Sequence, residues 1–202
     1  YLSNYFNKNL LSLSNVGYFI SFIPLLDDNL TLVMKPKRRK NWHKMSFNEK
    51  VLNNIKSNFW GKEFFVYKNN QVMPRWFFIK KIKFSEDRNK IFNDLKNKNP
   101  INLKDYAWIK NNINTAYPTN FLNENNHINL INYQPDKIIL KADIKSDNGF
   151  LFISNSWNKF WKSTVNGKLT KIHLTNGTFW GIFLSKGNNY IEFNYVPPYK
   201  LY

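Results

Sequence analysis

Side chains that commonly carry out chemistry are few and widely spaced in this chain. The three histidines, His43, His127 and His173, lie far apart, and no pair has the spacing of a zinc-binding helix motif. The 202 residues include no Cys, which excludes disulfides, Cys-ligated metals and a thiol nucleophile. There is no glycine-rich phosphate loop and no G-x-S-x-G nucleophile turn. We therefore expect no catalytic residue, no metal and no cofactor here.

One pair of adjacent carboxylates, Asp27-Asp28, stands just before an expected strand. Such a pair could bind a cation or act as an acid and base. Carboxylates at turns usually face water, however, so the sequence favours a solvated turn.

Basic residues point to binding rather than catalysis. The chain has 30 Lys and Arg against 13 Asp and Glu, a net charge of +17, which favours an anionic partner such as nucleic acid, acidic lipid or a phosphorylated polymer. Abundant Asn, Lys, Ile and Phe offer a second explanation, the composition of an AT-rich genome. The densest basic run contains Lys35, Lys37, Arg38, Arg39 and Lys40. It is either a contact for anionic head groups or a solvated loop.

Aromatic residues gather near the end of the sequence, at Trp157, Phe160, Trp161 and Trp180. Exposed rings could stack on the faces of sugars, whereas buried rings would be core, which is the commoner case. Aromatics and positive charge would also suit a single-strand nucleic-acid binder. No RRM-type motif, zinc finger or helix-turn-helix is present, so no nucleic-acid partner is expected.

The elements that would position these residues change character along the chain. Residues 1–110 predict an α+β part, with helices at 2–13, at 47–59 behind the capping box Ser46–Glu49, and from Ser85, and with strands at 16–23, 30–34, 63–68 and 76–84. Residues 111–135 are rich in Asn and predict a linker with one short strand near His127–Tyr133.

Residues 136–202 predict six short strands separated by turns, two of them at 146–149 and 186–189. Asn166-Gly167 is the strongest hairpin signal, because a type I′ turn needs positive φ at both central residues. We expect an α+β protein: a small N-terminal α/β part, then an antiparallel, jelly-roll-like β-sandwich, which could pack as one unit with strands of 1–110.

Four segments, taken in order, resemble blocks of the YfhO-type bacterial multi-pass membrane proteins. They are Leu11–Ser21, Phe65–Ile79 with its Pro74-Arg75, Ser85–Leu103 and, most closely, Gly149–Pro198. The last keeps Trp161, Asn166-Gly167-Lys168, Gly181, Gly187, Phe193-x-Tyr195 and Pro197, but has Phe160 where the family has Gly before Trp. The basic run at 35–40 and residues 114–126 match no block.

The resemblance implies a soluble C-terminal portion, on the extracytoplasmic face of the cell membrane, of a polytopic protein similar to GT-C glycosyltransferases. In such enzymes the catalytic acids lie in membrane-proximal loops, so this chain is expected to position a lipid-linked sugar or an anionic envelope polymer beside the membrane-embedded remainder. The candidate ligand contacts are Arg75, Trp76, Trp157, Trp161 and Lys162. The alternative is a free carbohydrate-binding β-sandwich module.

Overall fold

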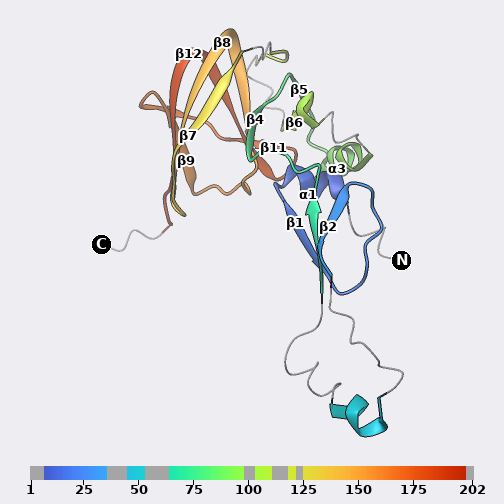
Figure 1. Ribbon diagram of the computed structural model, residues 1–202. Coiled ribbons are helices and arrows are strands. Elements are labelled where there is room, and N and C mark those ends of the chain that lie inside the picture. The colour runs from blue at the N-terminus through green and yellow to red at the C-terminus, as the bar shows by residue number, and fades with distance from the viewer. Residues whose placement is uncertain are drawn as a thin grey trace. The chain divides into compact units, whose positions relative to one another are not determined.

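The chain is mostly β-structure with few helices and divides into two compact units. The computed structural model describes residues 7–35, 45–52, 64–97, 103–110, 118–121 and 125–198. One unit combines residues 1–15 with residues 73–202, and the other is Val16–Val72 (Figure 1). Each unit has its own sheet and is described by itself.

The smaller unit holds a three-stranded antiparallel sheet. Its strands are β1 (Tyr18–Ser21), β2 (Leu30–Met34) and β3 (Phe65–Asn69), in the order β1-β3-β2. Residues 47–52 are helical, and the predicted capping box is confirmed: the backbone N–H and hydroxyl of Ser46 each donate to the Glu49 carboxylate at 2.8 Å. The hydrogen bonds from Ser46 lower the pKa of Glu49.

In the described residues of the larger unit there are a nine-stranded mixed sheet and two helices. The helices are α1 (Lys8–Leu13) and α3 (Arg88–Asn97). The strands are β4 (Trp76–Phe78), β5 (Lys81–Phe84), β6 (Tyr106–Ile109), β7 (His127–Tyr133), β8 (Lys137–Ile153), β9 (Trp161–Val165), β10 (Lys168–Thr170), β11 (His173–Thr175) and β12 (Phe179–Tyr195). β7 confirms the strand predicted within 111–135.

The strand predicted over 76–84 is two strands with different partners. β4 pairs antiparallel with β8, whereas β5 pairs in parallel with β6 after a crossover through α3. Residues 79–80 between them hydrogen-bond outside these ladders, with the N–H of Ile79 donating to the carbonyl of Phe150 at 2.9 Å. The short run that forms β6 was not foreseen in the sequence.

The turns predicted at 146–149 and 186–189 are wrong, because β8 and β12 are 17-residue strands that continue through them. Their pairing shifts register between Ser185 and Gly187, a bulge at which three residues of β8 face one of β12. Gly187, with φ of 97°, and the small Gly149 allow the bend without ending the ladder. A bulge re-aims both strands while nearly all of their backbone hydrogen bonds are kept.

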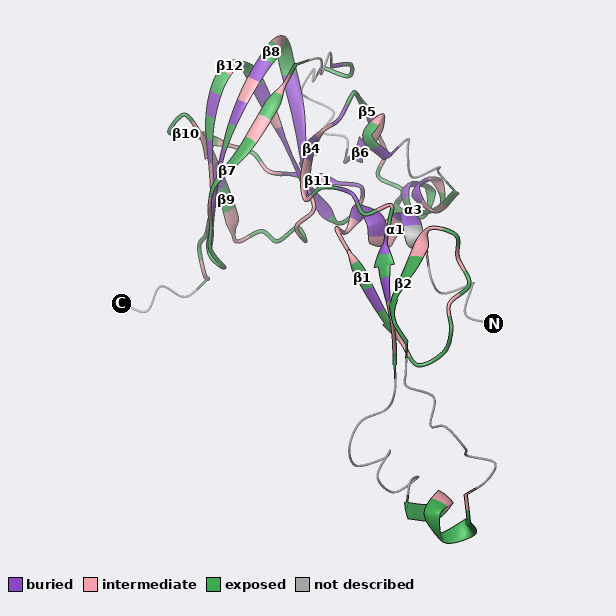
Figure 2. Ribbon diagram, viewed as in Figure 1, coloured by how far each residue is buried: buried purple, intermediate pink, exposed green. Residues whose placement is uncertain are grey.

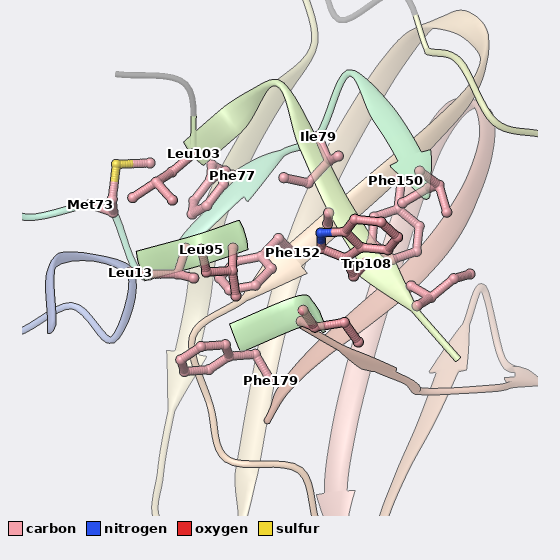
Figure 3. Packing of buried hydrophobic residues seen from close by; sticks show 14 of the residues in the cluster. Leu13, Met73, Phe77, Ile79, Leu95, Leu103, Trp108, Phe150, Phe152 and Phe179 are labelled. Carbon is pink, nitrogen blue, oxygen red and sulfur yellow. The ribbon is translucent and has the colours of Figure 1, made fainter. Parts of the chain in front are cut away.

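Two hydrophobic cores lie on opposite faces of the central strands, because neighbouring residues such as Phe152 and Ile153 belong to different clusters. The ribbon is buried along much of these strands (Figure 2). One core takes side chains from both halves of the bent strands, including Ile138 and Phe193 from one half and Ile153 and Trp180 from the other. The second core packs Phe150 and Phe152 against α1, α3 and their neighbours (Figure 3). Residues 149–153 are therefore buried on both faces, which explains their unbroken small and apolar run, whereas buried and more exposed residues alternate over 140–144.

The antiparallel arrangement of the C-terminal strands is confirmed, but they belong to one mixed sheet rather than to two separately paired sheets. The jelly-roll-like sandwich therefore stays a prediction. The proposed division at residues 110 and 135 also stays a prediction. Strands from 1–110, 111–135 and 136–202 all contribute to the nine-stranded sheet.

Candidate functional site

A hollow of about 520 Å³ lies beside the β9–β10 hairpin of the larger unit. It brings together three of the predicted contacts, Trp157, Trp161 and Lys162. The residues that complete its lining are Asn158, Lys159, Ser163, Leu169, Thr170, Lys171 and Ile172. They come from the segment before β9, from both hairpin strands and from the segment that leads to β11.

The hairpin is positioned by its turn. Asn166 and Gly167 have φ of 51° and 77°, so the predicted type I′ turn is confirmed. The register then sets Ser163 opposite Thr170, and the Ser163 hydroxyl donates to the Thr170 carbonyl at 2.7 Å. The two strands are thereby held together at the end nearest the hollow.

The indole rings differ in how firmly they are held. Trp180 is buried, and its Nε1–H donates to the carbonyl of Ser156 at 2.9 Å. Trp161 packs against it with 4.9 Å between ring centroids, and lies 5.6 Å from the ring of Tyr195. Trp157 remains 42% exposed. The aromatic cluster is thus partly core, at Trp180, and partly an open wall of the hollow.

The hollow is electropositive. Of its ten lining residues, all within the described part of the chain, three are lysines and none is acidic. The positive field reaches the neighbouring His173: burial, with a smaller contribution from the charge of Lys171, lowers the pKa of His173 to about 4. A hollow with a free indole face and three cations suits a ligand that has both an apolar face and negative charge.

The sequence analysis did not predict Lys159, Leu169 and Lys171 as lining residues. For Lys171, the hairpin turn at 166–167 could have indicated its position. A two-residue turn at 166–167 sets Ser163 opposite Thr170. The next residues outward, Lys162 and Lys171, must then leave the hairpin at the same end. Lys159 could not be placed this way, because it lies in the irregular segment before β9.

The other two predicted contacts, Arg75 and Trp76, do not line the hollow. The Arg75 guanidinium donates to the hydroxyl of Tyr133 and lies 5.0 Å from the centroid of that ring, so it joins the start of β4 to the end of β7. Trp76 is opposite Ile153 in the β4–β8 ladder and packs on the core of the bent strands.

The basic run and the carboxylate pair belong to the smaller unit. Lys35 is exposed at the end of β2, and Lys37, Arg38, Arg39 and Lys40 lie outside the described residues. Asp27 accepts hydrogen bonds from the backbone and side-chain nitrogens of Asn29 at 2.9 and 3.0 Å. The expected turn is confirmed there, since an Asx turn occupies this carboxylate.

A second polar cluster surrounds Asp94 on α3. Its carboxylate accepts from the hydroxyl of Tyr106 and from Nε1 of Trp108, both at 2.8 Å, while Nζ of Lys83 lies 3.4 Å from the centroid of the Tyr106 ring. Burial, then the hydrogen bond and charge of Asp94, raise the pKa of Tyr106 to about 12. The phenol therefore stays protonated, and the cluster fastens α3 to β6 rather than forming an acid–base pair.

No group of three or more His, Asp or Glu side chains in the described ranges could share a metal ion. Within those same ranges, no helix has the length and hydrophobicity needed to cross a bilayer.

Comparison with known proteins identifies the family. Residues 68–202, well over half of the chain, match the model of the bacterial membrane protein YfhO. The chain belongs to the YfhO family. The match includes the whole hairpin hollow and confirms the resemblance seen in the sequence.

Among curated proteins, the uncharacterized protein YfhO of Bacillus subtilis (strain 168) is 26% identical over 97 residues. That alignment covers 48% of this chain and 11% of the relative, so the chain spans a small part of the relative's length. No solved structure matches the chain.

Proposed function

We propose that this chain is the ligand-positioning part of a YfhO-family membrane protein on the extracytoplasmic face, and that the hairpin hollow binds a sugar that carries phosphate. The ligand would be a lipid-linked sugar or an anionic envelope polymer. The transfer of the sugar would be carried out by the membrane-embedded remainder, which this chain would assist by holding donor or acceptor.

The observation that carries the proposal is the composition of the hollow. Trp157 and Trp161 present indole surface, and Lys159, Lys162 and Lys171 supply positive charge with no acidic neighbour in the lining. The CH face of a pyranose packs on an indole ring, and a phosphate beside three ammonium groups forms charge-assisted hydrogen bonds. Neutral sugar alone would leave the lysine repulsion uncompensated.

The packing around Trp161 and the hydrogen bond across the hairpin also support the proposal, because they hold the wall of the hollow in place. Trp161 is fixed between Trp180 and Tyr195, and the hairpin beneath it has a tight turn and a side-chain bond between its strands. A wall that is rigid before binding loses less conformational entropy when the ligand arrives. Trp157, by contrast, is open enough to meet a sugar directly.

To test the proposal, the 202-residue chain is titrated with a short oligosaccharide that carries one terminal phosphate. Binding is measured by tryptophan fluorescence and by calorimetry. We expect binding that weakens at least fivefold when the phosphate is removed. Trp157→Ala and the Lys162→Gln/Lys171→Gln pair should each weaken it about tenfold, equivalent to about 1.4 kcal/mol.

The matched controls are Tyr190→Ala, whose ring is 43% exposed against 42% for Trp157, and Lys141→Gln, an exposed lysine outside the hollow. Both should bind like the parent chain. Failure of the phosphorylated and neutral sugars alike to bind, or equal losses in the control variants, would contradict the proposal.

A further inference from the structure

Among the described residues of the smaller unit, one face of the three-stranded sheet carries apolar side chains that are exposed or half-exposed. Strand register places Tyr18 and Ile20 of β1, Val66 of β3 and Met34 of β2 on this face. Tyr18 is 60% exposed, Ile20 69% and Met34 47%. We call these four residues the β1–β2–β3 apolar face. On the opposite face Phe19 and Tyr67 are buried, and Leu32, which is paired with Tyr67, is 46% exposed.

Exposed apolar side chains continue in the segment between β2 and β3. The helical residues 47–52 carry Phe47, Val51 and Leu52, which are 79%, 40% and 57% exposed. Phe47 and Val51 are four residues apart and so lie on one side of a helix, with Leu52 beside them. The capping box at Ser46 and Glu49 stabilises the start of this helix, whose apolar side chains are exposed.

Positive charge accompanies this apolar surface. Lys68 is paired with both Tyr18 and Thr31 and therefore shares the apolar face, and the exposed Lys35 directly follows Met34. In sequence, residues 35–62 contain nine Lys and Arg residues and a single acidic residue, Glu49. Exposed large apolar residues interspersed with lysines are the pattern of segments that lie in a membrane interface.

The family match indicates that a membrane is near this chain. The YfhO match begins at residue 68, so nearly all of the smaller unit precedes it, yet the chain belongs to a family of bacterial membrane proteins. A partner protein with a complementary face would need acidic side chains for these lysines. An anionic bilayer provides both an apolar interior for Ile20 and Met34 and phosphate for Lys35 and Lys68.

We propose that the Val16–Val72 unit docks on an anionic lipid bilayer, with the β1–β2–β3 apolar face in the interface and its lysines among the lipid phosphates. The contact is peripheral, with side chains of the sheet entering the head-group region. Burying apolar area and neutralising lipid charge act together, so loss of either weakens binding.

Vesicle flotation of the 202-residue chain tests the proposal. We expect it to float with vesicles of phosphatidylcholine containing about a third phosphatidylglycerol, and to stay behind with pure phosphatidylcholine. Ile20→Ser with Met34→Ser should lower the partition coefficient at least tenfold, as expected for two apolar side chains returned to water. Lys35→Gln with Lys68→Gln should lower it at least fivefold, as one near-surface charge contributes about that factor.

Ile131→Ser is the matched control, since Ile131 is 55% exposed on β7 of the larger unit. It should float like the parent chain, and circular dichroism should show all variants folded. No flotation with phosphatidylglycerol vesicles, equal flotation with neutral vesicles, or equal loss in Ile131→Ser would overturn the proposal. So would sedimentation showing a dimer that Ile20→Ser with Met34→Ser dissociates, because a second copy would then cover the face.

Discussion

At the scale of single residues, burial decides which ionisable side chain can respond to pH. His173 is buried at the start of β11, with its ring edge-on to that of Phe183 and 5.1 Å between the ring centroids. Its pKa falls to about 4 because burial, and to a lesser extent Lys171, disfavour the charged imidazolium. The imidazole is therefore neutral in the folded chain at any pH where the protein is expected to work.

The lowered pKa of His173 makes the free energy of unfolding depend on pH. Between pH 6.5 and about 4 the unfolded chain binds a proton at His173 and the folded chain does not, so the free energy of unfolding falls as pH decreases. The stabilisation from this site is complete above pH 6.5 and is lost by pH 4. We expect a loss on the order of 3 kcal/mol, since one pKa unit is worth about 1.4 kcal/mol.

Urea denaturation at several pH values measures this pH dependence of the free energy of unfolding, with His173→Gln as the comparison. The variant should be less stable than the parent at pH 7 but should lack most of the slope between pH 6.5 and 4. Parallel stability curves for parent and variant across that range would contradict this role for His173.

At the scale of elements, the bent pair of β8 and β12 holds the larger unit together. Ladder bonds run along nearly the whole length of both strands, and β4, β7, β9 and β11 pair with one or the other. The missing side chain at Gly181 of β12 leaves space that the ring of Phe150 on β8 and the hydroxyl of Thr175 on β11 occupy. Gly181 faces Phe150 and Thr175 with no room for a methyl group.

Gly181→Ala tests this close approach. A Cβ at residue 181 would overlap the buried Phe150 ring and the Thr175 hydroxyl, so the strands must separate or the ring must move. We expect the free energy of unfolding to fall by more than about 2 kcal/mol, the upper part of the range for overpacked cores. Gly17→Ala is the control, because a Cβ there meets no atom within 4 Å. Similar urea midpoints for both variants would contradict the packing argument.

At the scale of the whole molecule, the net charge of +17 favours anionic partners but opposes compactness. The five ion pairs seen among the described residues have exposed or half-exposed partners and contribute little. Repulsion among the 30 basic residues is therefore the larger electrostatic effect.

Salt should consequently stabilise the chain. Raising NaCl from about 0.1 M to about 1 M shortens the Debye length from about 10 Å to about 3 Å and screens repulsion more than the few ion pairs. We expect the unfolding midpoint measured by calorimetry to rise by several degrees. An unchanged or lower midpoint would mean that attractive pairs balance the excess positive charge.

Local features of the chain followed from the sequence alone. The capping box at Ser46, the turn at Asn166-Gly167, the short strand at His127–Tyr133 and the family could all be recognised there, because each depends on neighbouring side chains or on blocks of residues in a given order. The capping box and the turn are decided by φ preferences and hydrogen bonds within a few residues.

Only the tertiary structure decided how distant segments meet. Residues 146–149 and 186–189 have the composition of turns, yet they bend two long strands, because pairing between 137–144 and 187–194 retains ladder bonds that a local turn would lose. The hollow likewise depends on this pairing. It joins Trp157 and Lys159 to a hairpin held on β12, whereas Arg75 is drawn to Tyr133. Which exposed side chains face a common space is set by long-range packing, and that is where sequence pattern carries least information.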